Sequence, residues 1–441
     1  MNASVHDGMP LAEVAVIGAG CSGLAALKAL REQGVTVTCF EQGSDVGGLW
    51  RYENDNCLSG AYASLRTNAS RRRMQYPSFP MPVAYGDYPT CTDMAAYLAA
   101  YADEFGLRNA ISFNTTVQRL EPRPDGAGWW IVLDDGSVHS FRAVVIAIGV
   151  FWCPKLPSYP GIFAGQMSHS HNYRTPDAFA QQRVLVVGGG QSAAEIAVEV
   201  SRVADRTLMS VRSGAHVIPR WIGDKPYDAG DVEPLNRMPW RLMNLVYGLP
   251  AARARGVYPT SWPSPAHRLL ERIPIISSDL LPAVRRCEVI VTPAIASFAG
   301  ESVRFVDATE EVVDRIIYAT GYRISLPFLS QSLLTPHGRD LPLYRRIVPP
   351  GLVGLYFVGF VDAPGGLLPV VETQAEWLAA AVSGRLAVPS SEAMWRAIEL
   401  AEPRTRERFP GECPHSIRCD PHAYRRLLRS DLQRSRRRTF V

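Results

Sequence analysis

The chain has 441 residues, which is enough for two to three domains and a sizeable hydrophobic core. Hydrophobic residues make up 47% and charged residues 20%, as in an ordinary globular protein, and the formal net charge of +4 is too small to indicate nucleic-acid binding. The longest apolar run, residues 143–153, is too short to span a bilayer and no secretion signal opens the chain, so we expect a cytoplasmic protein that does not bind a membrane.

The cysteines and histidines give no sign of a metal site or a disulfide framework. Eight cysteines are scattered along the chain, which favours reduced thiols. Cys413, His415, Cys419 and His422 lie near one another, but their spacings do not fit the usual zinc-binding pairs. We therefore predict that no metal is bound.

The first chemical signal is a glycine-rich turn. Residues 14–17 predict a buried strand, and the apolar spacing of residues 24–30 predicts a helix. The glycines between them, at 18, 20 and 23, permit a tight turn, a close approach of a pyrophosphate and close helix–strand packing. The phosphates would lie at the positive end of the helix dipole.

The second strand of this unit, residues 35–40, ends in Glu41. A carboxylate there can accept hydrogen bonds from ribose hydroxyls, and it repels a 2′-phosphate. The first site is therefore predicted to hold FAD or NAD rather than NADP. A loop with paired glycines follows at 43–50, where Trp50 can cover a flat ligand.

The remaining elements of the first half follow in chain order. Residues 92–105 predict an amphipathic helix, and three strands are predicted, at 111–120, 128–133 and 144–149, the last returning to the first site. A connector rich in proline and glycine, residues 154–161, then separates two domains.

A second glycine-rich turn repeats the first about 170 residues later, with Gly188, Gly190 and Ala193 as its fingerprint. The strand that follows, residues 206–211, ends in Arg212 instead of an acid. An arginine there can pair bidentately with a 2′-phosphate, so the second site is predicted to prefer NADPH. One dinucleotide donates hydride and the other accepts it, and the natural partner of NADPH is a flavin.

These patterns predict an α/β fold with two Rossmann-like dinucleotide-binding domains. We expect residues 1–160 and 324–441 to form the FAD domain, with the NADPH domain, residues 161–323, inserted between its halves. Residues 221–286 predict helices and loops, and residues 315–322 a strand that leads back to the first domain. A further strand is expected at 355–359, a helix from residue 368 and a solvated, frayed arginine-rich tail.

A motif between the two turns carries a family resemblance. Phe163, Gly165, His169 and Tyr173 match the pattern FxGxxxHxxxY, which resembles the signature of flavin-containing monooxygenases. Four further blocks of that family occur in the family order, at residues 47–50, 67–68, 319–322 and 374–377. The resemblance extends from about residue 14 to residue 377.

The resemblance implies roles for individual residues. Asn68 would act in catalysis, beside the flavin and the nicotinamide, whereas His169 and Tyr173 would organise the linker. The residues implied to bind FAD are Gly18, Ala19, Gly20, Cys21, Ser22, Gly23, Glu41, Gly48, Leu49, Trp50, Thr67, Asn68, Val117 and Gln374. Those implied to bind NADPH are Gly188, Gly190, Gln191, Ser192, Ala193 and Arg212.

The activity implied is oxygen insertion by a C4a-hydroperoxyflavin into the nucleophilic nitrogen or sulfur of a small molecule, with NADPH and O2 as co-substrates. A homodimer is a family-level expectation.

Three alternatives use similar folds. Baeyer–Villiger oxygenation of ketones is less favoured because Tyr173 stands where a tryptophan is common, and a disulfide reductase lacks its CxxC or CxxxxC pair. The third is an uncoupled NADPH oxidase that releases H2O2, or a binding protein that has lost activity, although the intact motif blocks argue against such a loss.

Overall fold

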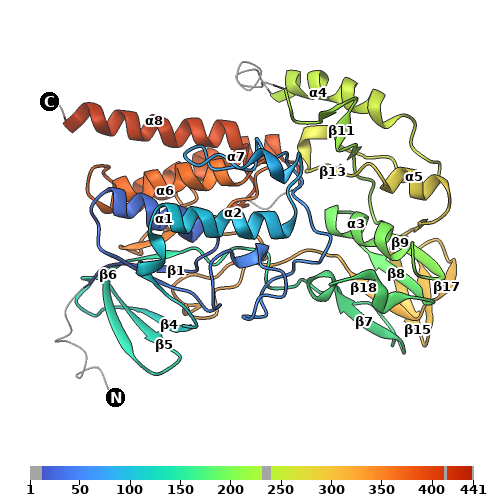
Figure 1. The fold of residues 1–441 in the computed structure, drawn as a ribbon, viewed down its shortest axis with the longest axis horizontal. Coiled ribbons are helices and arrows are strands. Elements are labelled where there is room, and N and C mark those ends of the chain that lie inside the picture. Colours follow the sequence, from blue (N-terminus) through green and yellow to red (C-terminus); the bar gives the residue numbers. More distant parts are fainter. Residues whose placement is uncertain (1–11, 231–239, 412–414, 440–441) are drawn as a thin grey trace. The chain divides into compact units, whose positions relative to one another are not determined.

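The computed structural model describes residues 12–230, 240–411 and 415–439, which fold into two units that each contain a sheet with parallel strands and flanking helices (Figure 1). The first unit comprises Met1–Ser59, Arg71–Cys153 and Arg323–Val441, and the second comprises Gly60–Ser70 and Pro154–Tyr322. The predicted α/β fold with two Rossmann-like units is confirmed.

The second unit includes two segments that the sequence-based boundaries had given to the first domain, residues 60–70 and the start of the connector. The connector pairs with the end of the second unit, since Pro154 forms a bridge to Tyr322 and the Lys155 amide donates to the Gly321 carbonyl at 2.9 Å. Residues 60–70, called here the Asn68 segment, are held by side chains of the second unit that are described below. The sequence did not indicate this, because the contacts lie more than a hundred residues away along the chain.

The sheet of the first unit has seven strands in the order β3-β2-β1-β6-β5-β4, with β19 also paired to β6. Pairing is parallel between β1, β2, β3, β6 and β19, and antiparallel between β4, β5 and β6. The strands are β1 (Ala12–Ile17), β2 (Val37–Phe40), β3 (Ile111–Ser112), β4 (Val117–Pro122), β5 (Trp129–Leu133), β6 (Val138–Ile146) and β19 (Leu355–Phe357).

The single strand predicted at 111–120 is wrong, because β3 and β4 are separate elements. Asn114 lies between them with φ of +51°, and its amide donates to the Gly43 carbonyl at 3.1 Å. A residue in the left-handed region interrupts an extended strand, and asparagine tolerates that conformation better than most residues.

The helices of the first unit are α1 (Cys21–Glu32), α2 (Cys91–Glu104), α6 (Leu368–Val382), α7 (Ser391–Arg408) and α8 (Pro421–Thr439). α1 packs against both α2 and α6 (Figure 1) and buries Leu24, Leu27 and Leu30 completely. α2 begins with a capping box in which Thr90 and Asp93 each accept a hydrogen bond from the other's backbone N–H, which accounts for its sharp start.

The C-terminal tail is an ordered helix, so the expectation of a frayed end is wrong. α8 contacts α6, and Tyr424 and Leu428 are 4% and 0% exposed. The two residues are four apart and therefore lie on one face of the helix. The arginines dominate the composition of this stretch, and they conceal a narrow apolar stripe that is enough to dock it.

The second unit has a five-stranded parallel sheet in the order β14-β9-β8-β18-β7. Its strands are β7 (Gln166–His169), β8 (Arg183–Val187), β9 (Arg206–Ser210), β14 (Ile290–Thr292) and β18 (Arg315–Tyr318). Smaller sheets are formed by β10 (Val217–Ile218) with β13 (Ile275–Ile276), by β11 (Trp221–Ile222) with β12 (Lys225–Pro226), and by β15 (Ile295–Ala299), β16 (Ser302–Phe305) and β17 (Glu310–Val312). The helices are α3 (Gln191–Val200), α4 (Trp240–Arg255) and α5 (Leu280–Arg285).

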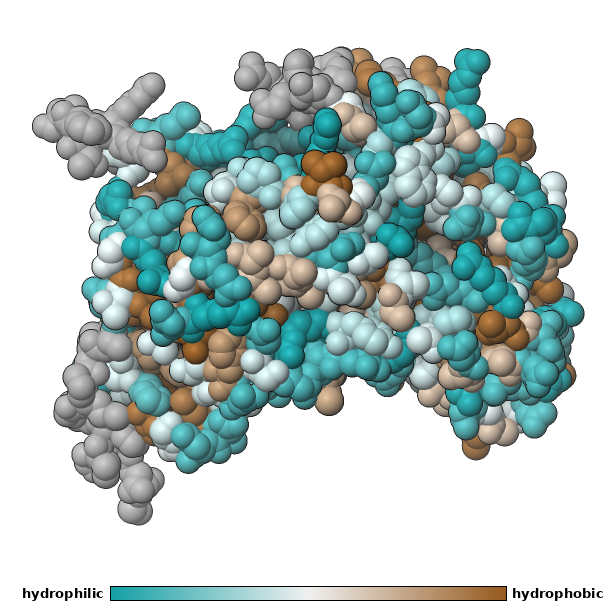
Figure 2. Space-filling model, viewed as in Figure 1, coloured by the Kyte–Doolittle hydropathy of each residue, from teal (hydrophilic) through white to brown (hydrophobic). Residues whose placement is uncertain are grey.

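The surface seen in Figure 2 is mostly hydrophilic, with hydrophobic residues in small separate groups. Within residues 12–230, 240–411 and 415–439, no helix combines the length and the apolar character needed to cross a bilayer.

Candidate cofactor sites

The first glycine turn, residues 18–23, joins β1 to α1 in a shape that only glycine permits. Gly18 has φ of +99°, and a Cβ on Gly23 would lie 1.8 Å from the Gly18 carbonyl oxygen. Gly20 is the N-cap of α1 and gives the helix no side-chain hydrogen bond. The first amide groups of α1 are thus uncapped and point to a place where phosphate oxygens can accept from them.

A second loop lies directly against this turn. The Gly47 amide donates to the Ala19 carbonyl at 3.1 Å, and a Cβ on Gly48, at φ of +55°, would lie 3.1 Å from the Gly20 Cα. Leu49 and Trp50 follow in a short 3-10 helix and are half-buried. The paired glycines therefore bring the loop's backbone to the place where a dinucleotide phosphate would lie.

Behind the turn, Cys21 and Ser22 open α1 and face inward. Burial raises the pKa of the Cys21 thiol, so it is protonated at neutral pH. Ser22 is 5% exposed and packs so closely on Gly359 that a Cβ there would lie 2.0 Å from the Ser22 Oγ.

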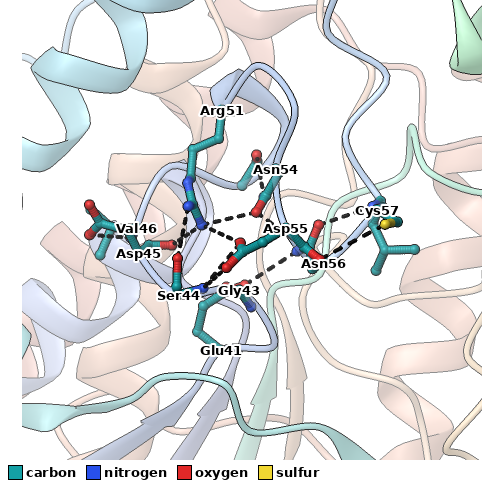
Figure 3. Close-up of polar contacts among 12 residues, drawn as sticks. Glu41, Gly43, Ser44, Asp45, Val46, Arg51, Asn54, Asp55, Asn56 and Cys57 are labelled. Carbon is teal, nitrogen blue, oxygen red and sulfur yellow. Dashed lines mark hydrogen bonds and ion pairs between the residues drawn. The ribbon is translucent and has the colours of Figure 1, made fainter.

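Glu41 stands at the carboxyl end of β2 and is only 4% exposed (Figure 3). One carboxylate oxygen accepts from the Ala19 amide at 2.6 Å and the other from the Gly43 amide at 2.7 Å. Both oxygens keep further lone pairs, so the carboxylate can still accept from a ribose hydroxyl. Its two amide bonds fix it beside the first glycine turn.

The loop after Glu41 is organised by Arg51, a residue that the sequence did not single out (Figure 3). Its guanidinium donates to the Asp45 carbonyl at 3.2 Å, to Asn54 Oδ1 at 2.9 Å and to Asp55 Oδ1 at 3.0 Å. The pKa of Asp55 lies below its usual range, mainly because Ser44 donates hydrogen bonds to its carboxylate. The loop that carries Gly47 and Gly48 is thereby held by charge-assisted bonds.

Two other residues predicted to bind FAD, Val117 and Gln374, make contacts inside the protein. Val117 opens β4, is 8% exposed and pairs with Leu133. Gln374 is fully buried on α6; its Oε1 accepts from the Gly359 amide at 3.0 Å and its Nε2 donates to the Tyr424 hydroxyl at 2.8 Å. The side chain of Gln374 therefore ties internal elements together, and its part in FAD binding stays a prediction.

The second glycine turn, residues 188–193, joins β8 to α3. Gly188 has φ of +148°, and a Cβ on it would lie 2.4 Å from the Ala319 carbonyl oxygen. Gly190 is the N-cap of α3, gives no side-chain cap, and has no neighbouring atom within 4 Å of where a Cβ would stand. This turn therefore presents uncapped amides beside open space, which fits a phosphate group.

The side chain of Gln191 is already used inside the protein. Its Nε2 donates to the Ile276 carbonyl at 2.9 Å, and its Oε1 accepts from the Ile276 amide at 2.8 Å. This pair ties the start of α3 to β13, so the backbone N–H of Gln191 is the group left to face a cofactor. Ser192 follows and is half-buried, whereas Ala193 is fully buried.

Arg212 lies just after β9 and is exposed. Within the described parts of the chain, its guanidinium has no hydrogen bond and no ion pair. Burial raises the pKa of the nearby Tyr159, and the positive charge of Arg212 opposes that shift. A free, exposed guanidinium at the end of the second strand fits a 2′-phosphate, because its forked donors match phosphate oxygens.

Thr67 and Asn68 belong to the second unit through their backbone. The Thr67 carbonyl accepts from Arg220 Nη1 at 2.9 Å, and the Asn68 carbonyl accepts from the Tyr227 hydroxyl at 3.3 Å. Thr67 is 1% exposed and its hydroxyl has no hydrogen-bond partner in the described structure, whereas the Asn68 side chain is exposed. A buried hydroxyl without a partner fits a place next to a polar ligand.

The linker residues His169 and Tyr173 make internal contacts. The Nδ1 of His169 accepts from the His171 amide at 3.1 Å, which leaves Nε2 as the donor to the Gly321 carbonyl at 3.1 Å. Tyr173 donates to Glu199 at 2.8 Å and is 2% exposed. Both side chains pin the second unit's own elements.

Among the residues that the structure describes, no group of three or more His, Cys, Asp or Glu side chains could hold a metal ion. Cys413, one of the four residues considered for zinc, lies outside the described residues.

The family model for flavin-binding monooxygenase-like proteins matches residues 12–428. The chain is 34% identical to human flavin-containing monooxygenase 3 over 419 residues, which cover 90% of this chain and 78% of the relative. The chain therefore belongs to the flavin-containing monooxygenase family. It is an NADPH-dependent oxidoreductase whose cofactors are FAD and NADPH.

Solved structures agree with this assignment. S-allyl-L-cysteine S-oxygenase from Allium sativum superposes with a TM-score of 0.72 at 26% identity, covering 96% of this chain and 89% of that chain. Cyclohexanone monooxygenase from Rhodococcus sp. Phi1, bound to NADP+, gives a TM-score of 0.72 at 18% identity and covers 97% and 98%. The second likeness concerns the fold alone.

Proposed function

We propose that this protein inserts one oxygen atom of O2 into a nucleophilic nitrogen or sulfur of a small molecule. The observation that carries the proposal is the opposite charge of the two glycine turns, with Glu41 buried at the first and Arg212 exposed at the second. A carboxylate suits a dinucleotide without a 2′-phosphate, and an arginine suits NADPH. The name of the Allium relative, an S-oxygenase at 26% identity, supports sulfur as one acceptor.

Bound FAD supplies hydride acceptance from NADPH and the activation of O2. The chain's own residues hold the cofactors. The uncapped amides of α1 would bind the FAD diphosphate, and Glu41 would accept from its ribose. The amides of α3 would bind the NADPH diphosphate, and Arg212 would pair with the 2′-phosphate.

Asn68 is our candidate catalytic residue. Its backbone carbonyl is fixed by Tyr227, while its side-chain amide is exposed and can both donate and accept. A side-chain amide carried on a fixed backbone can hold a reacting group in place and stabilise charge as it develops. Asn68 would therefore direct activated oxygen to the substrate and prevent its release as H2O2.

The variant Asn68→Ala tests this role. We expect it to bind FAD normally, while product formed per NADPH falls about tenfold and H2O2 rises to match, because a positioned polar group is lost. Flavin absorbance, NADPH consumption, O2 uptake and H2O2 are measured together, with Asn109→Ala, an exposed asparagine of the first unit, as the control. Unchanged coupling in Asn68→Ala would remove Asn68 from the mechanism.

The acceptor is tested by offering trimethylamine, a thioether, indole and a cyclic ketone in the same assay. We expect oxygenated amine or thioether as the product. A Baeyer–Villiger reaction stays the alternative, since the cyclohexanone enzyme shares the fold, and lactone formation from the ketone alone would favour it. Consumption of NADPH with H2O2 as the sole product for every compound would indicate an oxidase.

A further inference from the structure

We infer that Arg220 is a positioning residue that fixes the Asn68 segment for oxygen transfer. This inference rests on the role proposed for Asn68. It arises from a network in which one arginine joins a buried carboxylate to the backbone carbonyl next to Asn68.

Different nitrogens of the Arg220 guanidinium bind two groups of this network. Nη1 donates to the Thr67 carbonyl at 2.9 Å, and Nη2 forms an ion pair with Glu195 Oε1. The side chains of Arg220 and Glu195 are only 14% and 15% exposed, so water screens the pair weakly. The forked guanidinium can bind two acceptors at once, and a lysine ammonium cannot reproduce that geometry.

Glu195 itself is tied to the start of the same segment. Its Oε2 accepts from the Tyr62 hydroxyl, and its Oε1 also accepts from Gln191 Nε2 at 2.9 Å. One carboxylate on α3 therefore holds the segment at Tyr62 directly and at Thr67 through Arg220. A loop fastened at two points to one rigid helix has few conformations left.

The residues after Arg220 fasten the other side of Asn68. Tyr227 donates to the Asn68 carbonyl at 3.3 Å, and Asp228 accepts from the Ser70 amide at 2.8 Å. Arg220 is itself held, because its own amide donates to Ser278 Oγ at 3.1 Å. The backbone on both sides of Asn68 is thus bonded to one stretch of the second unit, while the Asn68 side chain stays exposed.

The network reaches one residue proposed to hold NADPH, Gln191, but it does so through the side chain, whereas the group proposed to face the cofactor is the Gln191 backbone N–H. Neither the Thr67 carbonyl nor the Glu195 carboxylate, two groups that Arg220 binds, is proposed to bind NADPH. Loss of Arg220 should therefore loosen the Asn68 segment without weakening coenzyme binding. This separation distinguishes a positioning role from a general loss of structure.

The test compares four variants of the full-length FAD-loaded protein. Glu195→Gln keeps one side-chain oxygen to accept from Arg220, and its amide NH2 can donate to the Tyr62 hydroxyl. Arg220→Gln/Glu195→Gln differs from it only at Arg220 and leaves no buried unpaired charge. Arg206→Gln, which removes an exposed ion pair with Glu311 in the same unit, is the control. Arg220→Lys is the conservative variant.

Three quantities are measured: amide hydrogen exchange of peptides covering residues 60–70, the Kd for NADP+, and H2O2 released per NADPH. Relative to Glu195→Gln, we expect the double variant to exchange about tenfold faster in this segment and to release several times more H2O2, because a charge-assisted hydrogen bond is lost. The Kd for NADP+ should stay within about twofold. Arg220→Lys should lie between the two variants.

Unchanged exchange in residues 60–70 of the double variant would overturn the inference, as would a Kd for NADP+ that rises in proportion to the lost coupling. The two proposals fail separately. If Asn68→Ala stays coupled while the double variant loosens the segment, Arg220 holds a segment without a catalytic function and the inference fails with the proposed role. If Asn68→Ala is uncoupled and exchange does not change, only the inference fails.

Discussion

The two glycine turns share one backbone design and differ in what surrounds it. Each joins a parallel strand to a helix whose N-cap is a glycine without a side-chain cap. The first is enclosed, with Glu41 buried and bonded to two amides and with Gly48 packed on Gly20. The second is open, since Gly190 has no neighbour within 4 Å of a Cβ position and Arg212 is exposed.

This difference matches two kinds of cofactor use. An enclosed site suits a cofactor that stays bound through many turnovers, whereas an open one suits a coenzyme that must enter and leave in each cycle. In both proposed sites the turn would supply the amides that bind phosphate. The residues outside the turn would then decide which dinucleotide binds and how long it stays.

The largest effect is expected at the third glycine of the enclosed turn. In Gly23→Ala the new Cβ would lie 1.8 Å from the Gly18 carbonyl oxygen, and backbone atoms cannot move aside. We expect a destabilisation of about 3 kcal/mol or more and loss of bound flavin. Thermal unfolding and flavin absorbance of the purified protein measure both.

The matched control is Ala193→Gly, which changes the corresponding position of the open turn in the opposite direction. It should cost about 1 kcal/mol, the usual penalty of glycine in a helix, and should keep the flavin. A Gly23→Ala protein that folds with full flavin would show that the first turn tolerates a Cβ at its third position, as the second turn does at Ala193.

A smaller effect, confined to one coenzyme, is expected from Arg212→Ala. Removing a charge-assisted pairing with the 2′-phosphate should raise the KM for NADPH about 10- to 100-fold. The KM for NADH should hardly change, because NADH has no 2′-phosphate. Steady-state kinetics with both coenzymes and with Arg206→Ala as control test this, and equal changes for NADPH and NADH would refute the assignment.

The smallest effect is expected from His169, whose side chain donates to the Gly321 carbonyl. This hydrogen bond holds the turn that lies against the second glycine turn. Burial lowers the pKa of His169 below 6.5, so the folded protein holds the neutral form while the unfolded chain takes up a proton. Stability should thus fall as the pH drops below about 6.5. His169→Gln keeps an N–H donor and does not titrate, so its Tm should fall less between about pH 7.5 and about pH 5.5. Identical losses of Tm would exclude this role.

The fold and the turns could be predicted because they depend on local pattern. Apolar strand runs, glycine spacing and the residue at the end of the second strand lie within short stretches of sequence. The seven-stranded and five-stranded sheets both contain the strands expected next to their turns. Where a strand was misjudged, as at Asn114, a single residue with positive φ was responsible.

The surroundings of the sites could not be predicted, because they depend on contacts between distant residues. Nothing near Gln374 indicates that its amide bonds Gly359 and Tyr424, and nothing near Thr67 indicates Arg220. A motif identifies residue types, but it does not show which of their side chains are already hydrogen-bonded to other parts of the protein. The buried stripe of α8 was missed for another reason, since two apolar residues among many arginines give a weak pattern.

The membership of the Asn68 segment in the second unit also affects protein engineering. An exchange of nucleotide units between relatives, made at residues 154 and 322 alone, would leave residues 60–70 facing a foreign partner. The donor's side chains would then have to replace Arg220, Tyr227 and Asp228 as ligands of that backbone. A working hybrid should transplant both stretches together, because the second unit is encoded by two separate parts of the gene.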